Sequence, residues 1–307
     1  MTQPKRLSLY DRVAEETAGV VIRRYSTSFG LASRLLTPEV RQHIENIYAL
    51  VRVADEIVDT YRGPDSRELL DGFERDVHAC MDGGFGTNLV AHAFGLTARQ
   101  VGVTKDMTAP FFASMRMDLE TTEHTPASFD RYVYGSAEVI GEMCLAAFVA
   151  TADGPGHATT EVREGARRLG AAYQKINFLR DIATDTDALG RSYFPGVTAT
   201  SLTDATLAGL VDDCKADIRA AELCLPALPR RARIAVATAS AAVGSSCRQP
   251  SEKLSGVTLT TPINAAGVAS TNPGATVQRR AVAPASRRMS PPAFWLPCSN
   301  VSAKSRS

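Results

Sequence analysis

The chain has 307 residues, of which 44% are apolar and 22% are charged, so it is long enough to bury a substantial core. Its formal net charge of +1 argues against a general polyanion binder, and we expect no nucleic-acid partner. The six cysteines include no C-x-x-C pair, which argues against a zinc site or a disulfide framework and favours a reducing cytoplasm. The N-terminus lacks the apolar segment of a signal peptide, and no run of about 18 uninterrupted apolar residues predicts a membrane span.

Helical periodicity recurs from residue 11 to residue 240, and no convincing alternating strand pattern interrupts it. Proline and glycine separate the periodic segments, as at Thr37-Pro38 and Gly83-Gly84. We therefore predict an all-α fold in which residues 11–240 form a single domain. The predicted helices cover residues 11–25, 38–60, 65–81, 89–101, 110–120, 128–152, 161–183, 203–223 and 229–239.

The composition changes at about residue 241. Residues 241–307 are rich in Ser, Thr, Pro and Ala, and they carry eight Lys or Arg but one Glu, a net charge of +7. Because the whole chain sums to +1, the first 240 residues carry −6. Such a tail cannot bury enough apolar surface to offset the entropy of ordering it. We predict a poorly structured basic tail, either natively disordered or out of frame, and translation of the other two frames would distinguish these origins.

A narrow polar face occurs on the predicted helix 38–60. At about 100° per residue, four polar residues fall within an arc of roughly 60°, namely Tyr48, Arg52, Asp55 and Asp59. Carboxylates crowded on an otherwise apolar helix repel one another and lose solvation unless a cation lies between them. The pattern therefore indicates the polar wall of a cavity, with an ordinary solvated face as the alternative.

A second polar face lies towards the end of the predicted helix 161–183. Four residues there fall within roughly 80°, namely Gln174, Asn177, Asp181 and Asp185. Oxygen ligands without His or Cys suit Mg²⁺ better than zinc or copper, and Mg²⁺ commonly bridges to substrate phosphates. Arg52 and Arg180 flank the two aspartate pairs and are candidates to contact diphosphate oxygens, with ion pairs to the neighbouring aspartates as the alternative.

Six motifs follow one another between residues 25 and 195. They are YSTSF at 25–29, YALVRVADEIVD at 48–59, MRMD at 115–118, YVYGSAEVIG at 132–141, QKINFLRDIATD at 174–185 and GRSYFP at 190–195. In this order they resemble the squalene/phytoene synthase family, in particular its bacterial phytoene synthases. The resemblance extends to about residue 239, and the chain has no segment similar to the last helices of the family.

The resemblance implies an isoprenoid synthase-type helical bundle around a central cavity. It also implies bound Mg²⁺, with Mn²⁺ as an alternative, and substrates that are isoprenoid diphosphates. The implied metal ligands are Asp55, Asp59, Asn177, Asp181 and Asp185. The candidate catalytic residues are Asp55, Asp59, Asp181, Asp185, Tyr48 and Arg52. The candidate substrate-binding residues are Ser26, Ser28, Phe29, Arg52, Tyr132, Tyr134, Gln174, Asn177 and Arg180.

Simpler roles stay open for several of these residues. Aromatic rings can stabilise cationic intermediates, but Phe29 and Tyr134 are equally suited to core packing. Ser26 and Ser28 are similar to the hydroxyl-bearing segment that lines the diphosphate region in the family, or else they cap helices.

The implied reaction is the head-to-head (1′–1) condensation of two geranylgeranyl diphosphates to phytoene, in carotenoid biosynthesis. One alternative is a C30 synthase that makes dehydrosqualene or squalene from farnesyl diphosphate, because cavity depth sets the chain length. Another is a catalytically impaired or non-catalytic helical member, because the aberrant C-terminus removes helices that close the cavity. The apolar product makes peripheral contact with the cytoplasmic membrane a further expectation.

Overall fold

The computed structural model describes residues 8–26, 30, 32–151, 154–189, 193–197 and 201–246, and the side chains of residues 180–189 and 242–246 lie outside this description. Every regular element within these ranges is helical, so the all-α prediction is confirmed. The α-helices are α1 (Leu9–Tyr25), α3 (Pro38–Asp55), α4 (Ser66–Met81), α5 (Leu89–Val101), α6 (Lys105–Glu120), α7 (Pro126–Val133), α8 (Val139–Val149), α9 (Thr160–Leu189), α10 (Asp204–Cys224) and α11 (Arg230–Ser246). Shorter elements are η1 (Glu56–Tyr61), η2 (Tyr134–Glu138) and η3 (Leu225–Ala227).

The helix starts follow local capping chemistry. The hydroxyl of Ser8 accepts from the backbone N–H of Asp11, and the Asp11 carboxylate accepts in return from the backbone N–H of Ser8. Thr37 caps α3 with Pro38 as its first residue. Both arrangements satisfy N–H groups that lack partners in the first helical turn, which is why these sequences begin helices where they do.

Two π-helices interrupt helices that the periodicity predicts as continuous. The predicted helix 38–60 divides into α3 and the π-helix η1, which begins directly after Asp55. The predicted helix 128–152 divides into α7, the π-helix η2 and α8. A π-turn accommodates an extra residue and rotates the side chains that follow it, and such turns are frequent at functional sites. Both are five or six residues long, too short to alter the periodicity of the longer segments around them.

Three helix ends differ from the predicted ones by five residues or more. Helix α6 begins at Lys105 rather than at 110, and it tolerates Pro110 inside because proline removes only one intrahelical hydrogen bond there. Helix α9 continues to Leu189 rather than ending at 183. Helix α11 continues to Ser246, beyond the predicted end at 239, through a segment rich in alanine, the best helix former. The rest of the predicted tail, residues 247–307, lies outside the described residues.

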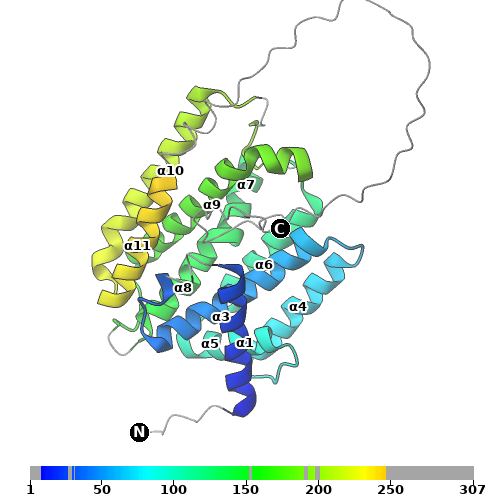
Figure 1. The fold of residues 1–307 in the computed structure, drawn as a ribbon, viewed down its shortest axis with the longest axis vertical. Coiled ribbons are helices and arrows are strands. Elements are labelled where there is room, and N and C mark those ends of the chain that lie inside the picture. The colour runs from blue at the N-terminus through cyan, green and yellow to red at the C-terminus, as the bar shows by residue number, and fades with distance from the viewer. Residues whose placement is uncertain are drawn as a thin grey trace, which may run out of the picture.

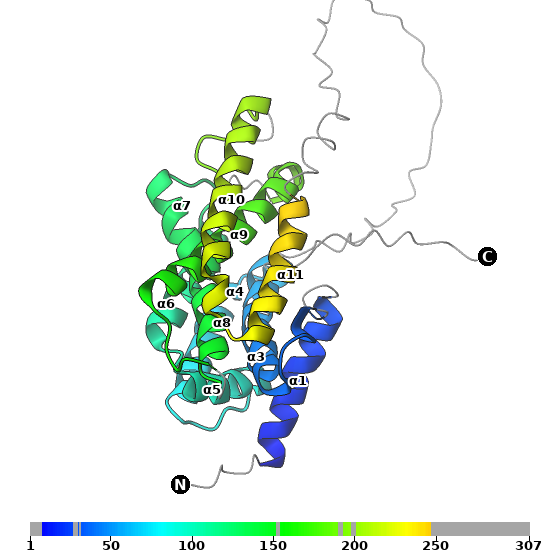
Figure 2. The same ribbon diagram turned by 90° about the vertical axis from the view of Figure 1, so that its left-hand side faces the viewer.

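The helices pack around two main groups of buried apolar side chains. One group joins α1, α3, α4, α5, α6 and α8 and includes Ile22, Leu50, Phe94 and Phe112. The other joins α7, α9 and α10 and includes Tyr132, Phe178, Leu179 and Ile218. Helix α10 lies along α9, and α11 runs beside α10 at one side of the bundle, as Figures 1 and 2 show. The described parts of the six motifs therefore belong to one bundle.

Helix α9 lies unusually close to the segment formed by η2 and α8. A Cβ atom built on Gly170 would stand 2.5 Å from the carbonyl oxygen of Ala137, and one built on Gly141 would collide with the carbonyl oxygen of Ala166. Only glycine permits this approach of two backbones. The continuous stretch Pro126–Val149 is long and apolar enough to cross a membrane, but 72% of its most apolar window is buried inside the protein, as in the core helix of a bundle.

Candidate active site

Asp55 is the last residue of α3 and lies almost entirely inside the protein, with 6% of its surface exposed. Burial raises the pKa of its carboxyl well above the usual range, and the negative charges of Asp59 and Asp118 raise it further, against the opposing charge of Arg52. Three carboxylates thus act on one another at a poorly solvated position. We call Asp55, Asp59 and Asp118 the acidic cluster.

Arg52 lies one helical turn before Asp55 and is 5% exposed. It forms an ion pair with Glu56, and its guanidinium carbon lies 4.2 Å from the centre of the Tyr25 ring. Among the described residues its Nε has no hydrogen-bond partner although it is buried. A buried donor of a charged group without an acceptor is costly, so this atom suits an anionic oxygen of a ligand.

Tyr48 lies one turn before Arg52 and connects the first two motifs. It shares a side-chain hydrogen bond with Ser26, which ends α1 and is 3% exposed. Burial raises the pKa of Tyr48 to about 12, so the phenol stays protonated and can donate a hydrogen bond. Tyr48, Arg52, Asp55 and Asp59 therefore form one polar wall, as their spacing predicts, and the alternative of a solvated face does not fit the burial of Arg52 and Asp55.

Asp118 is the main site residue that the sequence analysis does not select. It belongs to the motif at 115–118, on α6, and is 4% exposed. The hydroxyl of Tyr132 lies 2.8 Å from its Oδ1 and 3.1 Å from its Oδ2. A single acidic residue at a buried position of an amphipathic helix is the signal that could have identified it, but no spacing rule connects it with Asp55.

Tyr132 connects the acidic cluster with the later motifs. Its ring centre lies 5.9 Å from that of Phe178 on α9 and 5.7 Å from that of Tyr193. Phe178 and Tyr193 are themselves stacked at 4.1 Å, with 7° between their planes. These buried rings therefore join α9, at the residue that follows Asn177, to Asp118 of the acidic cluster.

Gln174 and Asn177 on α9 are both buried, with 2% and 5% of their surfaces exposed. Asp181 and Asp185 occupy the same helix one and two turns further on, but their side chains and that of Arg180 lie outside the described residues. Ser28 and Phe29 also lie outside them. Their assigned roles stay predictions.

Tyr134 is placed differently from Tyr132. It lies in η2 at the contact with α9, and the guanidinium carbon of Arg167 stands 5.1 Å from its ring centre. Its pKa is raised by burial and by the charge of Glu142, against that of Arg167. The structure therefore groups Tyr134 with the ion pairs of α8 and α9, and the role in substrate binding that the motif implies stays a prediction.

The donor set of the acidic cluster fits a divalent cation only in part. Within the described side chains, no three His, Cys, Asp or Glu residues converge tightly enough to hold a metal ion by themselves. The crowding that raises the pKa of Asp55 is nevertheless the situation that a cation relieves. Carboxylate and amide oxygens on two facing helices, completed by water and phosphate oxygens, are a common environment for Mg²⁺.

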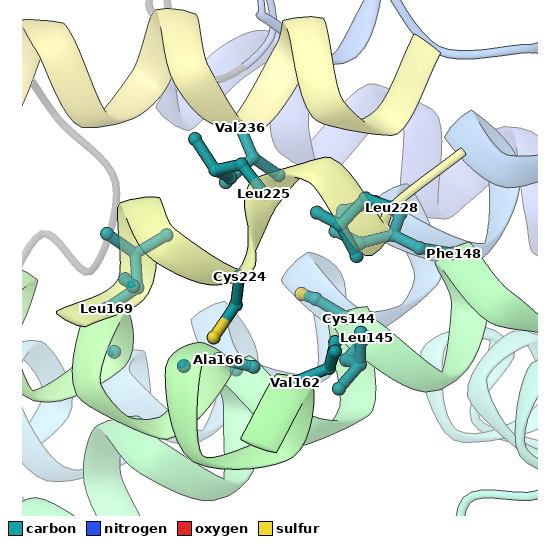
Figure 3. A pocket seen from close by; sticks show the side chains of 14 residues that line it. Cys144, Leu145, Phe148, Val162, Ala166, Leu169, Cys224, Leu225, Leu228 and Val236 are labelled. Carbon is teal, nitrogen blue, oxygen red and sulfur yellow. The ribbon is translucent and has the colours of Figure 1, made fainter. Parts of the chain in front are cut away.

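An apolar pocket lies between α8, α9, α10, η3 and α11 (Figure 3). Its cavity volume is about 50 Å³, and its walls include Cys144, Phe148, Leu169, Cys224, Leu228 and Val236. The positions of α9 that line it run from Val162 to Gly170, about 6 to 18 Å along the helix axis from Gln174. The pocket thus begins one turn from the second polar face.

The profile of the squalene/phytoene synthase family matches residues 22–249. The chain belongs to this family. The expected membership is confirmed, and the match runs about ten residues past the predicted end of the resemblance at residue 239, through the described part of α11.

Several curated relatives of this squalene/phytoene synthase family member are phytoene synthases. Phytoene synthase 3 of Zea mays, a chloroplast protein, is 33% identical over 194 residues, which cover 60% of this chain and 43% of the relative. The 15-cis-phytoene synthase of a Paracoccus species is 28% identical over 190 residues, which cover 59% of each chain. The chain thus spans between about a third and three fifths of the length of the curated relatives it matches.

Solved structures show the same fold for this family member. A squalene synthase from Alicyclobacillus acidocaldarius superposes with a TM-score of 0.71 at 20% identity, over 80% of this chain and 96% of the other. A dehydrosqualene synthase solved with a ligand superposes with a TM-score of 0.69 at 20% identity, over 79% and 88% of the two chains. The predicted isoprenoid synthase-type bundle is confirmed.

Proposed function

We propose that this protein condenses two isoprenoid diphosphates head to head (1′–1) with release of diphosphate, and that two geranylgeranyl diphosphates give phytoene. The observation that carries the proposal is the buried acidic cluster beside Arg52, whose Nε has no acceptor among the described residues. A surplus of buried negative charge needs a cation, and a buried cationic donor needs an anion. A divalent cation together with a diphosphate would satisfy both requirements.

Mg²⁺ is the proposed cofactor, with Mn²⁺ as the alternative. Asp55 and Asp59 would hold it on one side, and Asn177 would hold it on the other together with Asp181 and Asp185. Bound there, it would supply positive charge next to the leaving diphosphate. This assignment extends the pattern of the residues and the family resemblance.

The residues of the chain would act on the diphosphate and on the hydrocarbon separately. Arg52 would donate from Nε to a diphosphate oxygen and thereby stabilise the charge that develops when the allylic C–O bond breaks and its electron pair leaves with the diphosphate. Protonated Tyr48 would donate beside it. The double bond of the second substrate would then form the new C–C bond with loss of one proton. Cleavage of the second C–O bond would release the second diphosphate, and loss of another proton would give the hydrocarbon, with a released diphosphate accepting each proton.

The hydrocarbon parts require a dry, apolar space. The rings of Tyr132, Phe178 and Tyr193 would exclude water from the cationic intermediate, and their faces are electron-rich. The apolar pocket on α9, which begins one turn from Gln174, has the chemistry for a short part of an isoprenoid chain, but its volume of about 50 Å³ is too small for a whole chain.

The C30 alternative, with farnesyl diphosphate as substrate, differs only in the length of chain that the pocket accepts. A catalytically impaired or non-catalytic member stays the second alternative, because the composition of the C-terminus from about residue 241 is atypical. Incubation with labelled farnesyl and geranylgeranyl diphosphates in the presence of Mg²⁺, followed by product analysis, tests all three. Phytoene supports the proposal, a C30 product supports the alternative, and no diphosphate release from either substrate contradicts both.

The same proposal places the protein in the cytoplasm, with peripheral contact at the cytoplasmic membrane because its product is apolar. Fractionation of expressing cells, with and without a high-salt wash of the membranes, would test this location. Protein that stays soluble at every salt concentration would contradict the membrane contact.

A further inference from the structure

Asp217 on α10 is a charged residue with 1% of its side chain exposed. Its two oxygens accept from two different cations of α9. Oδ1 lies 2.8 Å from Nη1 of Arg168, and Oδ2 lies 2.8 Å from Nζ of Lys175. One buried carboxylate therefore joins two points of the helix that carries the second polar face.

The spacing of the two cations makes this contact sensitive to movement of α9 along its axis. Arg168 and Lys175 are two turns apart on α9, about 10 Å along its axis. Their side chains reach Asp217 from opposite ends, so any movement of α9 along α10 lengthens one ion pair while it compresses the other. Charge-assisted hydrogen bonds are short and directional, whereas apolar contacts between the same helices tolerate small displacements.

The carboxylates that contact these two cations differ in burial. Lys175 also binds Asp213 at 2.5 Å, but 56% of the Asp213 side chain is exposed. Arg168 also binds Glu164 at 2.9 Å, and 49% of that side chain is exposed. Exposed ion pairs contribute little, and a buried carboxylate that both cations share is the member of this group that can hold the helix in place.

Lys175 follows Gln174 directly, and Asn177 lies two residues further on. We infer that Asp217 is a positioning residue, which fixes α9 along α10 and thereby fixes the positions of Gln174 and Asn177 relative to the acidic cluster. This inference rests on the proposed function for its catalytic meaning, but the position of α9 can be measured without any activity. A displacement of about one ångström at such a site is enough to cost a large factor in rate.

The direct test compares D217N with D213N. Both variants remove a charge that Lys175 contacts, but only D217N removes the buried one. Crystal structures of the wild type and both variants should show Gln174 and Asn177 displaced relative to Asp55, by about one ångström, in D217N alone. Unchanged distances from Gln174 and Asn177 to Asp55 in D217N would overturn the inference.

A binding measurement gives the second readout. Binding of Mn²⁺ in the presence of inorganic diphosphate should weaken at least about 10-fold in D217N, and it should stay within about twofold of the wild type in D213N. Equal weakening in the two variants would overturn the inference. If the wild type does not bind Mn²⁺ and diphosphate at all, the proposed function fails, and the structures alone then decide the role of Asp217.

The triple variant R168M/D217M/K175M distinguishes a positioning role of Asp217 from a purely stabilising one. It also replaces D217N in the test if D217N does not fold. Apolar side chains of similar size often replace a buried ion-pair network without loss of stability. We expect this variant to melt near the wild-type temperature but to bind Mn²⁺ and diphosphate at least about 10-fold more weakly than the wild type. Recovery of both stability and wild-type binding would show that Asp217 serves stability alone and would overturn the inference.

Discussion

The hydroxyl of Tyr132, on α7, lies 2.8 Å from Oδ1 of Asp118, on α6, and neither residue is exposed by more than 4%. This hydrogen bond joins the motif at 115–118 to the motif at 132–141. Asp118 lies close enough to Asp55 to raise its pKa, and the Tyr132 ring contacts Phe178 on α9. Two residues fourteen positions apart thus connect the two polar faces.

The first prediction concerns this pair. D118N and Y132F should each lower kcat/KM roughly 10- to 100-fold, because Y132F removes a buried hydrogen bond to a charged group, worth about 1.5–3 kcal/mol, and D118N removes the charge that strengthens this bond. D106N, at an exposed position of the same helix, is the control and should leave kcat/KM unchanged. Since the two residues act through one contact, D118N/Y132F should lose no more than the worse single variant. Fully additive losses would show that they act independently.

The second prediction concerns Asp55 and pH. Because burial raises its pKa, Asp55 binds its proton more tightly in the folded protein than in the unfolded chain, where the value is near 3.8. Its ionisation therefore opposes folding, and this destabilisation grows as the pH rises from that ordinary value towards the raised one. D55N should raise the Tm of the metal-free protein at pH 8, by roughly 2–4 °C for each kcal/mol gained, and should abolish activity.

Thermal melts in a chelator at pH 5 and pH 8 would measure this effect. The gain from D55N should be larger at pH 8 than at pH 5, and Mg²⁺ should stabilise the wild type more than the variant. D76N, at an exposed position of α4, should melt like the wild type at both pH values. A D55N protein that is less stable than the wild type at pH 8 would contradict this account of the acidic cluster.

The third prediction concerns the close approach of α9 to η2. A methyl group at Gly170 would stand 2.5 Å from the carbonyl oxygen of Ala137, so Gly170→Ala must push two backbones apart. We expect a loss of about 1–3 kcal/mol in the free energy of unfolding. Gly209→Ala on α10 is the matched control, because nothing lies within 4 Å of its added methyl group. It should stabilise by about 0.5–1 kcal/mol, since alanine favours helices. Equal changes in the free energy of unfolding for the two variants, measured by denaturant titration, would contradict the close approach of α9 to η2.

The fourth prediction concerns the apolar pocket. Cys144 is buried in its wall, and burial raises the pKa of the thiol to about 12, so it is inert at neutral pH and acts as a small apolar residue. Cys144→Phe should shorten the accessible space and lower kcat/KM for geranylgeranyl diphosphate relative to farnesyl diphosphate. Leu223→Phe adds bulk at a position of α10 that is 83% exposed, and it should leave that ratio unchanged. Competition between the two labelled substrates gives the ratio directly. An unchanged ratio in Cys144→Phe would show that this pocket does not determine which substrate length is preferred.

Local patterns were sufficient to predict most of the helices and the first polar wall. Tyr48, Arg52 and Asp55 are placed on one face by the backbone geometry of a single helix, which spacing alone specifies. The family was predicted from six short motifs and is confirmed. The π-helices η1 and η2 could not be predicted in this way, because each is stabilised by packing around it rather than by a distinct periodicity.

The sequence by itself determined the helical class, the first polar wall and the family, since all of these depend on residues within a few turns of one another. Only the tertiary structure decided that Asp118 adds a third carboxylate to Asp55 and Asp59, and that Tyr132 joins them to α9. It alone placed Asp217 between Arg168 and Lys175. Such contacts join helices far apart in the chain, and their energies depend on burial and distance, which spacing along a sequence does not specify.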